Sequence, residues 1–176
     1  MRNVVFSILL TLITLVTSGC YSPKERNLQV GDFSIYLPAQ KMSAVQISKA
    51  DLDTLELEDK PILSIDDIIS YSKETHEIEL TASAYERIGG LEVPVTTGIP
   101  FVVCVGREPI YSGAFWVSYS SMSFYDSVVI DTLPATQHHS IRIQLGYPES
   151  PELFRGEDRR SDPRILQSLE RAGKLK

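Results

Sequence analysis

The sequence predicts an α+β fold, a small mixed or antiparallel sheet with two or three short helices on one face. Two apolar runs, residues 101–105 and 110–117, are joined by the short polar stretch Gly106-Arg107-Glu108. Apolar runs joined by a few residues that include a glycine are typical of a β-hairpin. Alternating segments supply further strands, and capped segments supply the helices. We therefore expect the hairpin to lie at the centre of the sheet.

Six segments are expected to form strands, because each is an apolar or alternating run bounded by turn residues. They are residues 33–37, 76–80, 101–105, 109–117, 127–131 and 140–145. Two weaker candidates, residues 44–47 and 55–57, lie in an acidic stretch. The alternation is clearest in residues 76–80, where an isoleucine and a leucine oppose two glutamates. One face of that strand should therefore be buried and the other solvated.

Two capping boxes predict short helices inside the domain. The first box pairs Ser64 with Asp67. The buried stripe of that helix should consist of Ile65, Ile68 and Ile69. The second box pairs Ser83 with Glu86 and opens a helix that ends at a pair of glycines.

Residues 149–176 are rich in charge and proline, which favours a solvated tail beyond a globular domain of residues 31–148. A short helix is expected inside this tail. Asp162 followed by Pro163 is typical of a helix start, and Gly173 is typical of a helix end. The narrow apolar stripe of this helix consists of Ile165, Leu166 and Leu169. That stripe can dock either on the domain or on a partner.

The first twenty residues have the organisation of an export signal. Arg2 precedes thirteen uncharged residues, 4–16, and small residues then lead to Cys20. Thirteen residues are too few to span a bilayer, which requires about 20 in a helix. The pattern therefore predicts a secretory signal peptide, cleaved either directly before Cys20 or nearby with Cys20 incidental.

Small residues directly before a cysteine resemble the signal peptide of bacterial lipoprotein precursors, although Thr17 stands where that family prefers leucine. The resemblance implies that residues 1–19 are removed and that Cys20 is acylated, with palmitate or a similar fatty acid. It further implies a cell-envelope protein anchored to a membrane, with residues 20–30 as a tether. Tyr21 in place of aspartate favours the periplasmic side of the outer membrane in a bacterium with two membranes. With a single membrane, the anchor would lie in the outer face of the cytoplasmic membrane.

The charge of the chain limits its partners. It carries 17 basic and 23 acidic residues, a net charge of −6. Nucleic acids and anionic lipids attract basic surfaces, so we expect no nucleic-acid partner, and partners should be neutral or basic. The three histidines, His76, His138 and His139, have no further Cys or His at metal-ligand spacing around them. We expect neither a metal nor a cofactor.

One short motif is shared with serine enzymes. Residues 70–73 fit the Ser-x-x-Lys spacing of penicillin-binding proteins, in which the lysine helps to activate the serine. The companion Ser-Asp-Asn and Lys-Thr-Gly elements of those enzymes do not occur in this sequence. We therefore expect no enzyme activity, and the alternative is a small envelope hydrolase that uses Ser70 and Lys73 or a histidine.

The second cysteine, Cys104, lies between valines in the most apolar run. Apolar neighbours cannot stabilise a thiolate, so we expect this thiol to be buried and unreactive rather than a reactive group.

The densest aromatic group surrounds the only tryptophan. In a continuous strand Tyr111, Phe115 and Tyr119 would share one face. That face is either part of the core or, together with the serines of residues 118–123, a binding surface for peptide or glycan.

Three segments resemble, in the same order, the head subdomain of the first periplasmic region of SecD. They are Leu80-Thr81-x-x-Ala84-x-x-Arg87, Pro100-Phe101-Val102-Val103 and Ile110-Tyr111-Ser112-Gly113. That subdomain has a short helix after a strand and then a hairpin whose turn usually carries Asp-Gly, which is missing here. The resemblance covers about 40 of 176 residues and implies an α+β fold. The family's role in translocation uses transmembrane segments and is not implied.

Together these features predict a membrane-anchored cell-envelope lipoprotein that acts as a non-catalytic binding module. Its partner would be an envelope protein or a glycan. A further alternative is that the C-terminal helix, rather than an aromatic surface, docks the partner.

Overall fold

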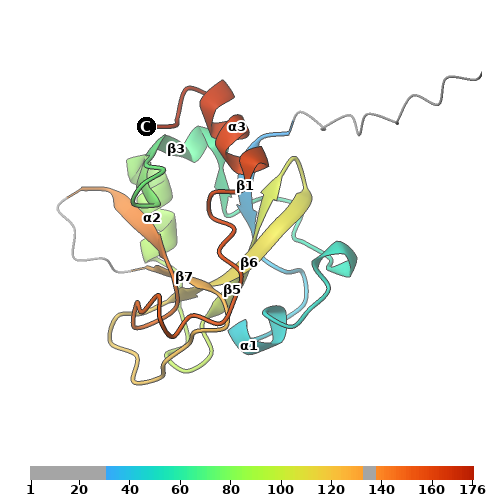
Figure 1. The fold of residues 1–176 in the computed structure, drawn as a ribbon, viewed down its shortest axis with the longest axis vertical. Helices are drawn as coiled ribbons and strands as arrows, with labels where there is room; N and C mark the ends of the chain where they lie inside the picture. Colours follow the sequence, from blue (N-terminus) through green and yellow to red (C-terminus); the bar gives the residue numbers. More distant parts are fainter. Residues whose placement is uncertain (1–30, 133–137) are drawn as a thin grey trace, which may run out of the picture.

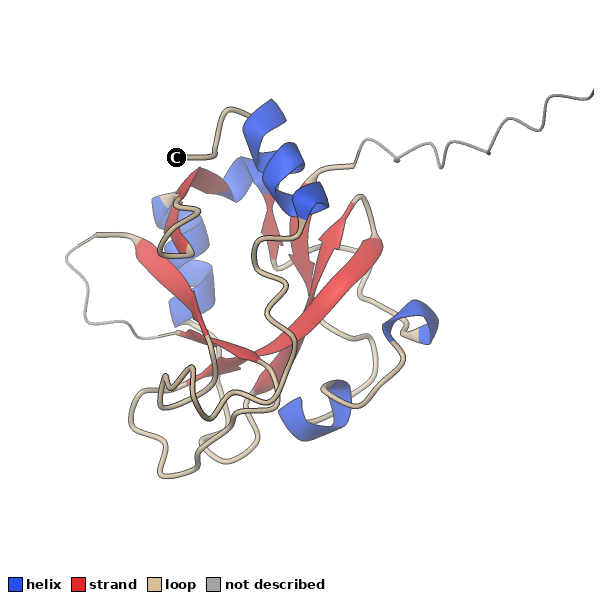
Figure 2. Cartoon of the chain, viewed as in Figure 1, coloured by secondary structure: helices blue, strands red, loops and turns tan. Residues whose placement is uncertain are grey.

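The computed structural model describes residues 31–132 and 138–176. Within these residues eight strands form one sheet, in the order β2-β1-β5-β6-β7-β8-β4-β3. The sheet curls into an almost closed barrel with short helices around it (Figures 1 and 2). The predicted α+β class is confirmed at this level, but strands dominate the fold.

The strands are short except for the central pair. Their bounds are β1 Phe33–Tyr36, β2 Leu63–Ser64, β3 Ile68–Tyr71, β4 Glu77–Leu80, β5 Ile99–Val105, β6 Glu108–Trp116, β7 Val128–Asp131 and β8 Ser140–Gln144. Every neighbouring pair is antiparallel except β6 and β7, which run parallel with Gly113 opposite Val128. The sheet is therefore mixed, because β6 pairs antiparallel with β5 on one side and parallel with β7 on the other.

The central hairpin is β5–β6, as the apolar runs predicted. Its turn is tighter than expected, because Val105 pairs with Glu108 and only two residues lie between them. Both turn residues have positive φ, 63° at Gly106 and 66° at Arg107. This backbone matches the twist of the two strands. A Cβ at Gly106 would also lie 2.9 Å from the Cα of Gly31, so a glycine fits this position.

The helices lie on two faces of the sheet rather than on one. Their bounds are α1 Ala44–Ile47, α2 Ala82–Gly89 and α3 Pro163–Arg171. Apolar side chains of α2 and α3 pack into the main core inside the barrel. In contrast, Ile47 of α1 packs outside, against Tyr36, Val102 and Cys104. The two faces of β5 are therefore both buried, which explains its unbroken apolar run.

Two local predictions were wrong about the type of element. Residues 44–47 form helix α1 instead of a strand, because the side chain of Ser43 accepts the N–H of Gln46 in a capping box. After Ser64 the expected helix is a single 3-10 turn, Ile65–Asp67, and the chain then enters strand β3. The capping contact itself exists, since the N–H of Ser64 donates to Asp67 Oδ2 over 2.8 Å.

Pairing with β4 explains why that helix does not continue. Ile68 faces Leu80 across the strand pair and is fully buried, whereas Ile69 is 49% exposed. This alternation is that of a strand, and the ladder to β4 replaces the helical hydrogen bonds. Helix α2 forms as predicted, but its N-cap is Thr81, whose hydroxyl accepts the N–H of Ala84, rather than Ser83.

The C-terminal segment differs from the solvated tail that its composition suggested. Residues 149–162, here called the strap, cross the open side of the curled sheet and lead into α3 (Figure 1). The predicted start and stop of that helix are confirmed, and its Ile165 and Leu169 are fully buried. Beyond it, Leu175 bridges to Tyr71 at the edge of β3. The apolar stripe therefore docks on the domain itself.

The pairing of β1, β5 and β6 gives the domain two different ends. At one end Phe33 lies opposite Val105, beside α3 and close to residue 31, where the described chain begins. At the other end these strands lead into residues 37–43, 91–98 and 117–124. We call this the distal end, and it lies at the bottom of Figure 1. No helix in the described part of the chain is long and apolar enough to cross a membrane.

Candidate binding surface at the distal end

The structure separates the three aromatic residues that the sequence placed on one surface. Tyr111 is 6% exposed and Phe115 is fully buried, while Tyr119 is 67% exposed. The shared face of β6 points into the barrel, where the ring of Phe115 lies 4.9 Å from that of Phe101. Strand β6 ends at Trp116, so Tyr119 belongs to a loop. The predicted surface is therefore wrong for Tyr111 and Phe115, and only Tyr119 can contact a partner.

An open groove of about 740 Å³ lies at the distal end, where the sequence gave no indication of one. Its lining includes the apolar side chains of Leu37, Pro38, Met42, Ile99 and Pro100. Leu37, Met42 and Ile99 are only partly buried, so the floor presents apolar surface to solvent. A groove of this size lies within the range of ligand sites in proteins.

Backbone hydrogen bonds hold the walls of the groove together. The N–H of Ala39 donates to the carbonyl of Glu56, and the N–H of Glu58 donates to the carbonyl of Leu37. On the other side the N–H of Ala44, at the start of α1, donates to the carbonyl of Thr97 over 3.1 Å. The walls are therefore fixed before any partner binds, which lowers the entropic cost of binding.

Gly98 lets the floor of the groove approach the core closely. Its φ is +61°, and a Cβ there would lie 2.6 Å from the ring of Trp116. Trp116 in turn stacks on Phe124, with ring centroids 5.6 Å apart, and packs near Tyr147. The Tyr147 hydroxyl donates to the carbonyl of Ser118 over 2.6 Å. These contacts tie the loop of residues 117–124 to the sheet.

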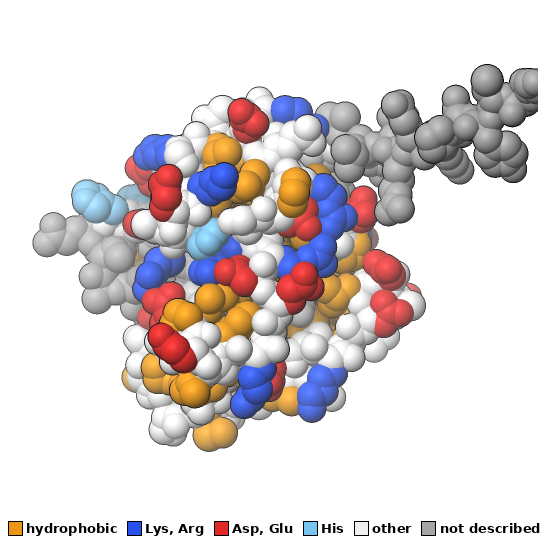
Figure 3. Space-filling model, in the orientation of Figure 1, with side chains coloured by type: hydrophobic (Ala, Val, Ile, Leu, Met, Phe, Trp, Pro, Cys, Tyr) orange, Lys and Arg blue, Asp and Glu red, His pale blue; other side chains and the backbone are white. Residues whose placement is uncertain are grey.

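Large apolar side chains are exposed on the segments of the distal end that adjoin the groove. Val45, Val95, Tyr119 and Met122 are between 43% and 67% exposed. The Ser120 hydroxyl donates to the carbonyl of Val95, so two of the loops are in direct contact. Figure 3 shows apolar side chains among the loops at the lower left of this face, below a band of mixed charges. Exposed apolar side chains gathered on one end of a domain mark an interaction surface.

The charged side chains of the groove are mostly acidic. Glu58 and Glu92 are exposed in its lining, with one lysine, Lys41. Among the described residues neither glutamate forms an ion pair with a basic side chain. The adjoining stretch adds further carboxylates at Asp51, Asp53, Glu56 and Asp59. Arg107 lies beside this stretch but donates to the backbone carbonyls of Glu58 and Asp59, not to carboxylates.

The serine and lysine of the Ser-x-x-Lys motif do not meet. Ser70 lies in strand β3, and its hydroxyl donates to Glu79 Oε2 over 2.9 Å. Lys176 Nζ contacts the same oxygen at 3.2 Å. These contacts, with the Ser70 bond foremost, lower the pKa of Glu79. Lys73 is exposed in the turn after the strand, where a spacing of three residues does not place two side chains together.

His76 is buried directly before strand β4. Its φ is +54°, and the Tyr71 hydroxyl lies 3.0 Å from its Nδ1. Burial and then the nearby Arg160 lower the pKa of His76, and Asp158 opposes them. The turn that carries His76 folds its ring inward, against the strap. The other two histidines are exposed, and the ring of His139 lies 5.2 Å from that of Tyr85.

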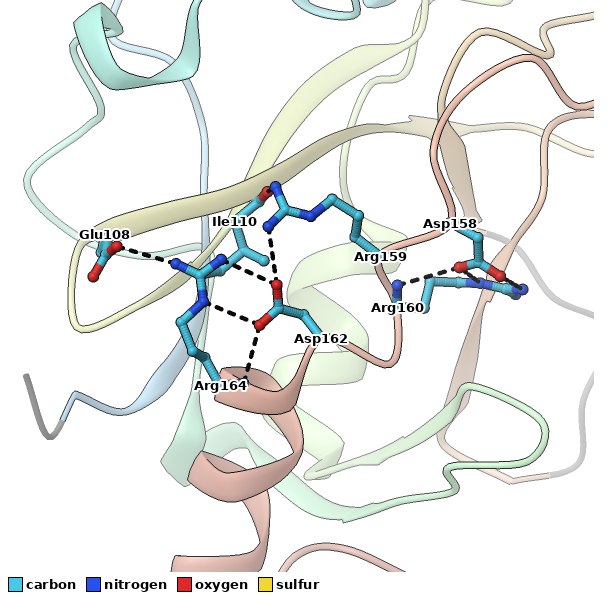
Figure 4. Close-up of polar contacts among 7 residues, drawn as sticks. All are labelled: Glu108, Ile110, Asp158, Arg159, Arg160, Asp162 and Arg164. Atoms are coloured by element: carbon cyan, nitrogen blue, oxygen red, sulfur yellow. Dashed lines mark hydrogen bonds and ion pairs between the residues drawn. The ribbon is translucent and has the colours of Figure 1, made fainter. Parts of the chain in front are cut away.

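The strap is fastened by two clasps of arginine and aspartate (Figure 4). In the first, Arg160 binds Asp158 through Nε and Nη2 at 2.8 Å and donates Nη1 to the carbonyl of Ile143 over 2.9 Å. In the second, Asp162 accepts hydrogen bonds from Arg164 and Arg159. The Arg164 bonds lower the pKa of Asp162 to about 2. The sequence did not indicate either clasp, because closely spaced arginines and aspartates are equally typical of a solvated tail.

The structure describes one of the two cysteines, Cys104, and its predicted burial is confirmed. Cys104 is fully buried and free, and burial raises the pKa of its thiol to about 12. Cys20 and the tether lie outside the described residues. Across residues 31–132 and 138–176, no three His, Cys, Asp or Glu side chains are grouped so that they could hold a metal ion.

The chain matches no protein-family model, no curated protein and no solved structure. The likenesses to lipoprotein signals and to the SecD head subdomain therefore stay resemblances of short segments.

Proposed function

We propose that this protein is a lipid-anchored binding module of the cell envelope, which holds a partner at its distal end by non-covalent contacts. The observation that carries the proposal is the groove, whose apolar floor is open to solvent, with exposed apolar side chains on the adjoining segments. A module anchored in the cell envelope would have an envelope protein or a glycan as its partner. The Ser70 and Lys73 alternative has no contact in its favour.

The place where the described chain begins supports this proposal. Residue 31 lies at the end of the domain opposite to the groove. Acylation of Cys20 would leave eleven residues, 20–30, between the lipid and the domain. At about 3.3 Å per residue such a tether reaches at most about 36 Å. The anchored end would then face the membrane, and the distal end would be free to meet a partner.

The anchor is tested by intact mass and membrane fractionation of the wild type beside Cys20→Ala. The wild type is expected to carry lipid mass and to sediment with membranes, and Cys20→Ala is expected to do neither. Cys104→Ala is the matched control, because it removes the buried cysteine and leaves the anchor in place. If wild type and Cys20→Ala are both lipid-free and soluble, the anchored module is refuted.

A further inference from the structure

We infer that the distal groove binds an extended polypeptide segment that combines aliphatic side chains with at least one lysine or arginine. This inference rests on the proposed function and names the chemistry of the partner. It depends on three properties of the groove: its aliphatic floor, its two exposed glutamates, which form no ion pair among the described residues, and its open shape.

The floor selects aliphatic side chains. Leu37, Met42 and Ile99 offer partly exposed aliphatic surface, and the lining contains no aromatic residue. Methionine adapts its shape to different apolar partners. A glycan would be expected to stack on aromatic rings inside the groove, but Trp116 and Phe124 stack behind the floor, and the exposed Tyr119 is not part of the lining. The floor therefore favours a polypeptide over a glycan.

The carboxylates select a basic segment. Glu58 and Glu92 come from two different segments of the chain, and both face solvent in the lining of the groove. Lys41 is the one basic side chain in that lining. The acidic stretch next to Glu58 has the same sign, so its field adds to theirs. A lysine or arginine would be attracted to this groove, and an acidic segment would be repelled.

The groove is open rather than enclosed, so a partner segment can reach its floor directly from solvent. Its walls are already fixed by the hydrogen bonds of Ala39, Ala44 and Glu58. A partner segment would therefore be ordered on a rigid site, and affinity would be set by the few side chains that enter it.

The test measures binding of three fluorescent hexapeptides to the full-length protein in detergent by fluorescence anisotropy. The peptides are Ac-Ala-Lys-Val-Lys-Val-Ala-NH2, the same peptide with glutamate for lysine, and the same peptide with serine for valine. We expect the Lys/Val peptide to bind at least about tenfold more tightly than either of the others.

The protein variants then locate the site. The double change Glu58→Gln with Glu92→Gln keeps the shape of both side chains and is expected to weaken binding of the Lys/Val peptide about fivefold. The control, Glu74→Gln with Glu170→Gln, removes the same charge at exposed positions outside the groove and should leave the affinity within about twofold. Circular dichroism confirms that both variants fold.

The inference is overturned if the Glu/Val or Lys/Ser peptide binds as tightly as the Lys/Val peptide, if none of the peptides binds, or if the two double variants behave alike. Each of these results concerns the chemistry of the partner segment. The proposed function is judged separately, by crosslinking from the distal end in cells, so that the two can fail independently.

Discussion

The hydroxyl of Ser168 accepts the backbone N–H of Phe33 over 2.8 Å, which joins the last helix of the chain to its first described strand. The two residues are 135 positions apart, and Ser168 is 1% exposed. The bond satisfies a buried N–H at the end of the sheet where the described chain begins. It therefore makes α3 part of the domain rather than an appendage.

Replacing Ser168 by alanine should destabilise the fold by about 1–2 kcal/mol, because the N–H of Phe33 would be buried without a partner. Urea unfolding followed by circular dichroism measures this difference. Gln167→Ala is the control, since Gln167 is an exposed neighbour on the same helix. Equal stability of both variants would mean that α3 is not held through this bond.

Arg160→Met should have a larger effect on stability. It leaves Asp158 and the carbonyl of Ile143 without their shared partner, at a cost of roughly 2–3 kcal/mol. The control is Arg155→Met, which also breaks an ion pair of the strap, but at a side chain that is 65% exposed. Little change is expected there. Similar losses in the two variants would contradict the first clasp as the main fastening of the strap.

Stability should fall as the pH is lowered from about 7.5 to about 5.5, through the unfolded pKa of histidine near 6.5. Burial lowers the pKa of His76 in the folded state, so the unfolded chain binds its proton first. The stabilising contribution is therefore complete above pH 6.5 and is lost as the pH falls toward the folded pKa. Urea midpoints across this range measure the slope.

His76→Asn should flatten this slope, because asparagine cannot be protonated here and tolerates a positive φ such as the 54° of His76. The matched control is His139→Asn, at an exposed histidine, and it should keep the wild-type slope. An unchanged slope in His76→Asn would assign the pH dependence to other groups.

Cys104 should react with a thiol reagent only as fast as the protein opens. Its sulfur is fully buried, and a pKa of about 12 leaves almost no thiolate at neutral pH. Labelling is followed by mass spectrometry, and the same protein in concentrated urea provides the fast reference. Rapid stoichiometric labelling without urea would show that the outer face of β5 is accessible.

The parts of the fold that the sequence predicted well have local causes. The hairpin, α2 and the bounds of α3 depend on apolar runs and on start and stop residues within a few positions. The strand nature of Ile68–Tyr71 depends instead on pairing with β4, and its capping contact at Ser64 gave a misleading indication of a helix. Local rules cannot reveal such a competition between a helix and a distant strand.

The site was harder to predict than the fold, because its parts are distant in the sequence. Residues 37–43, Glu58 and residues 92–100 meet only after β1 pairs with β5. The sequence indicated Tyr119 as a surface residue, but it grouped Tyr119 with Tyr111 and Phe115, whose side chains are buried inside the barrel. The acidic character of the chain, by contrast, was visible in its composition, which predicts a neutral or basic partner.

The most direct test of the proposed module is photocrosslinking in cells, with a photoreactive amino acid at Tyr119 and, as a control, at Gln167 on α3. Both positions are exposed, but only Tyr119 lies at the distal end. A partner site at the distal end of an anchored protein should give a discrete crosslinked product from position 119, its loss in Cys20→Ala, and no product from position 167. No product from position 119, or the same product from both positions, would contradict a partner site at the distal end.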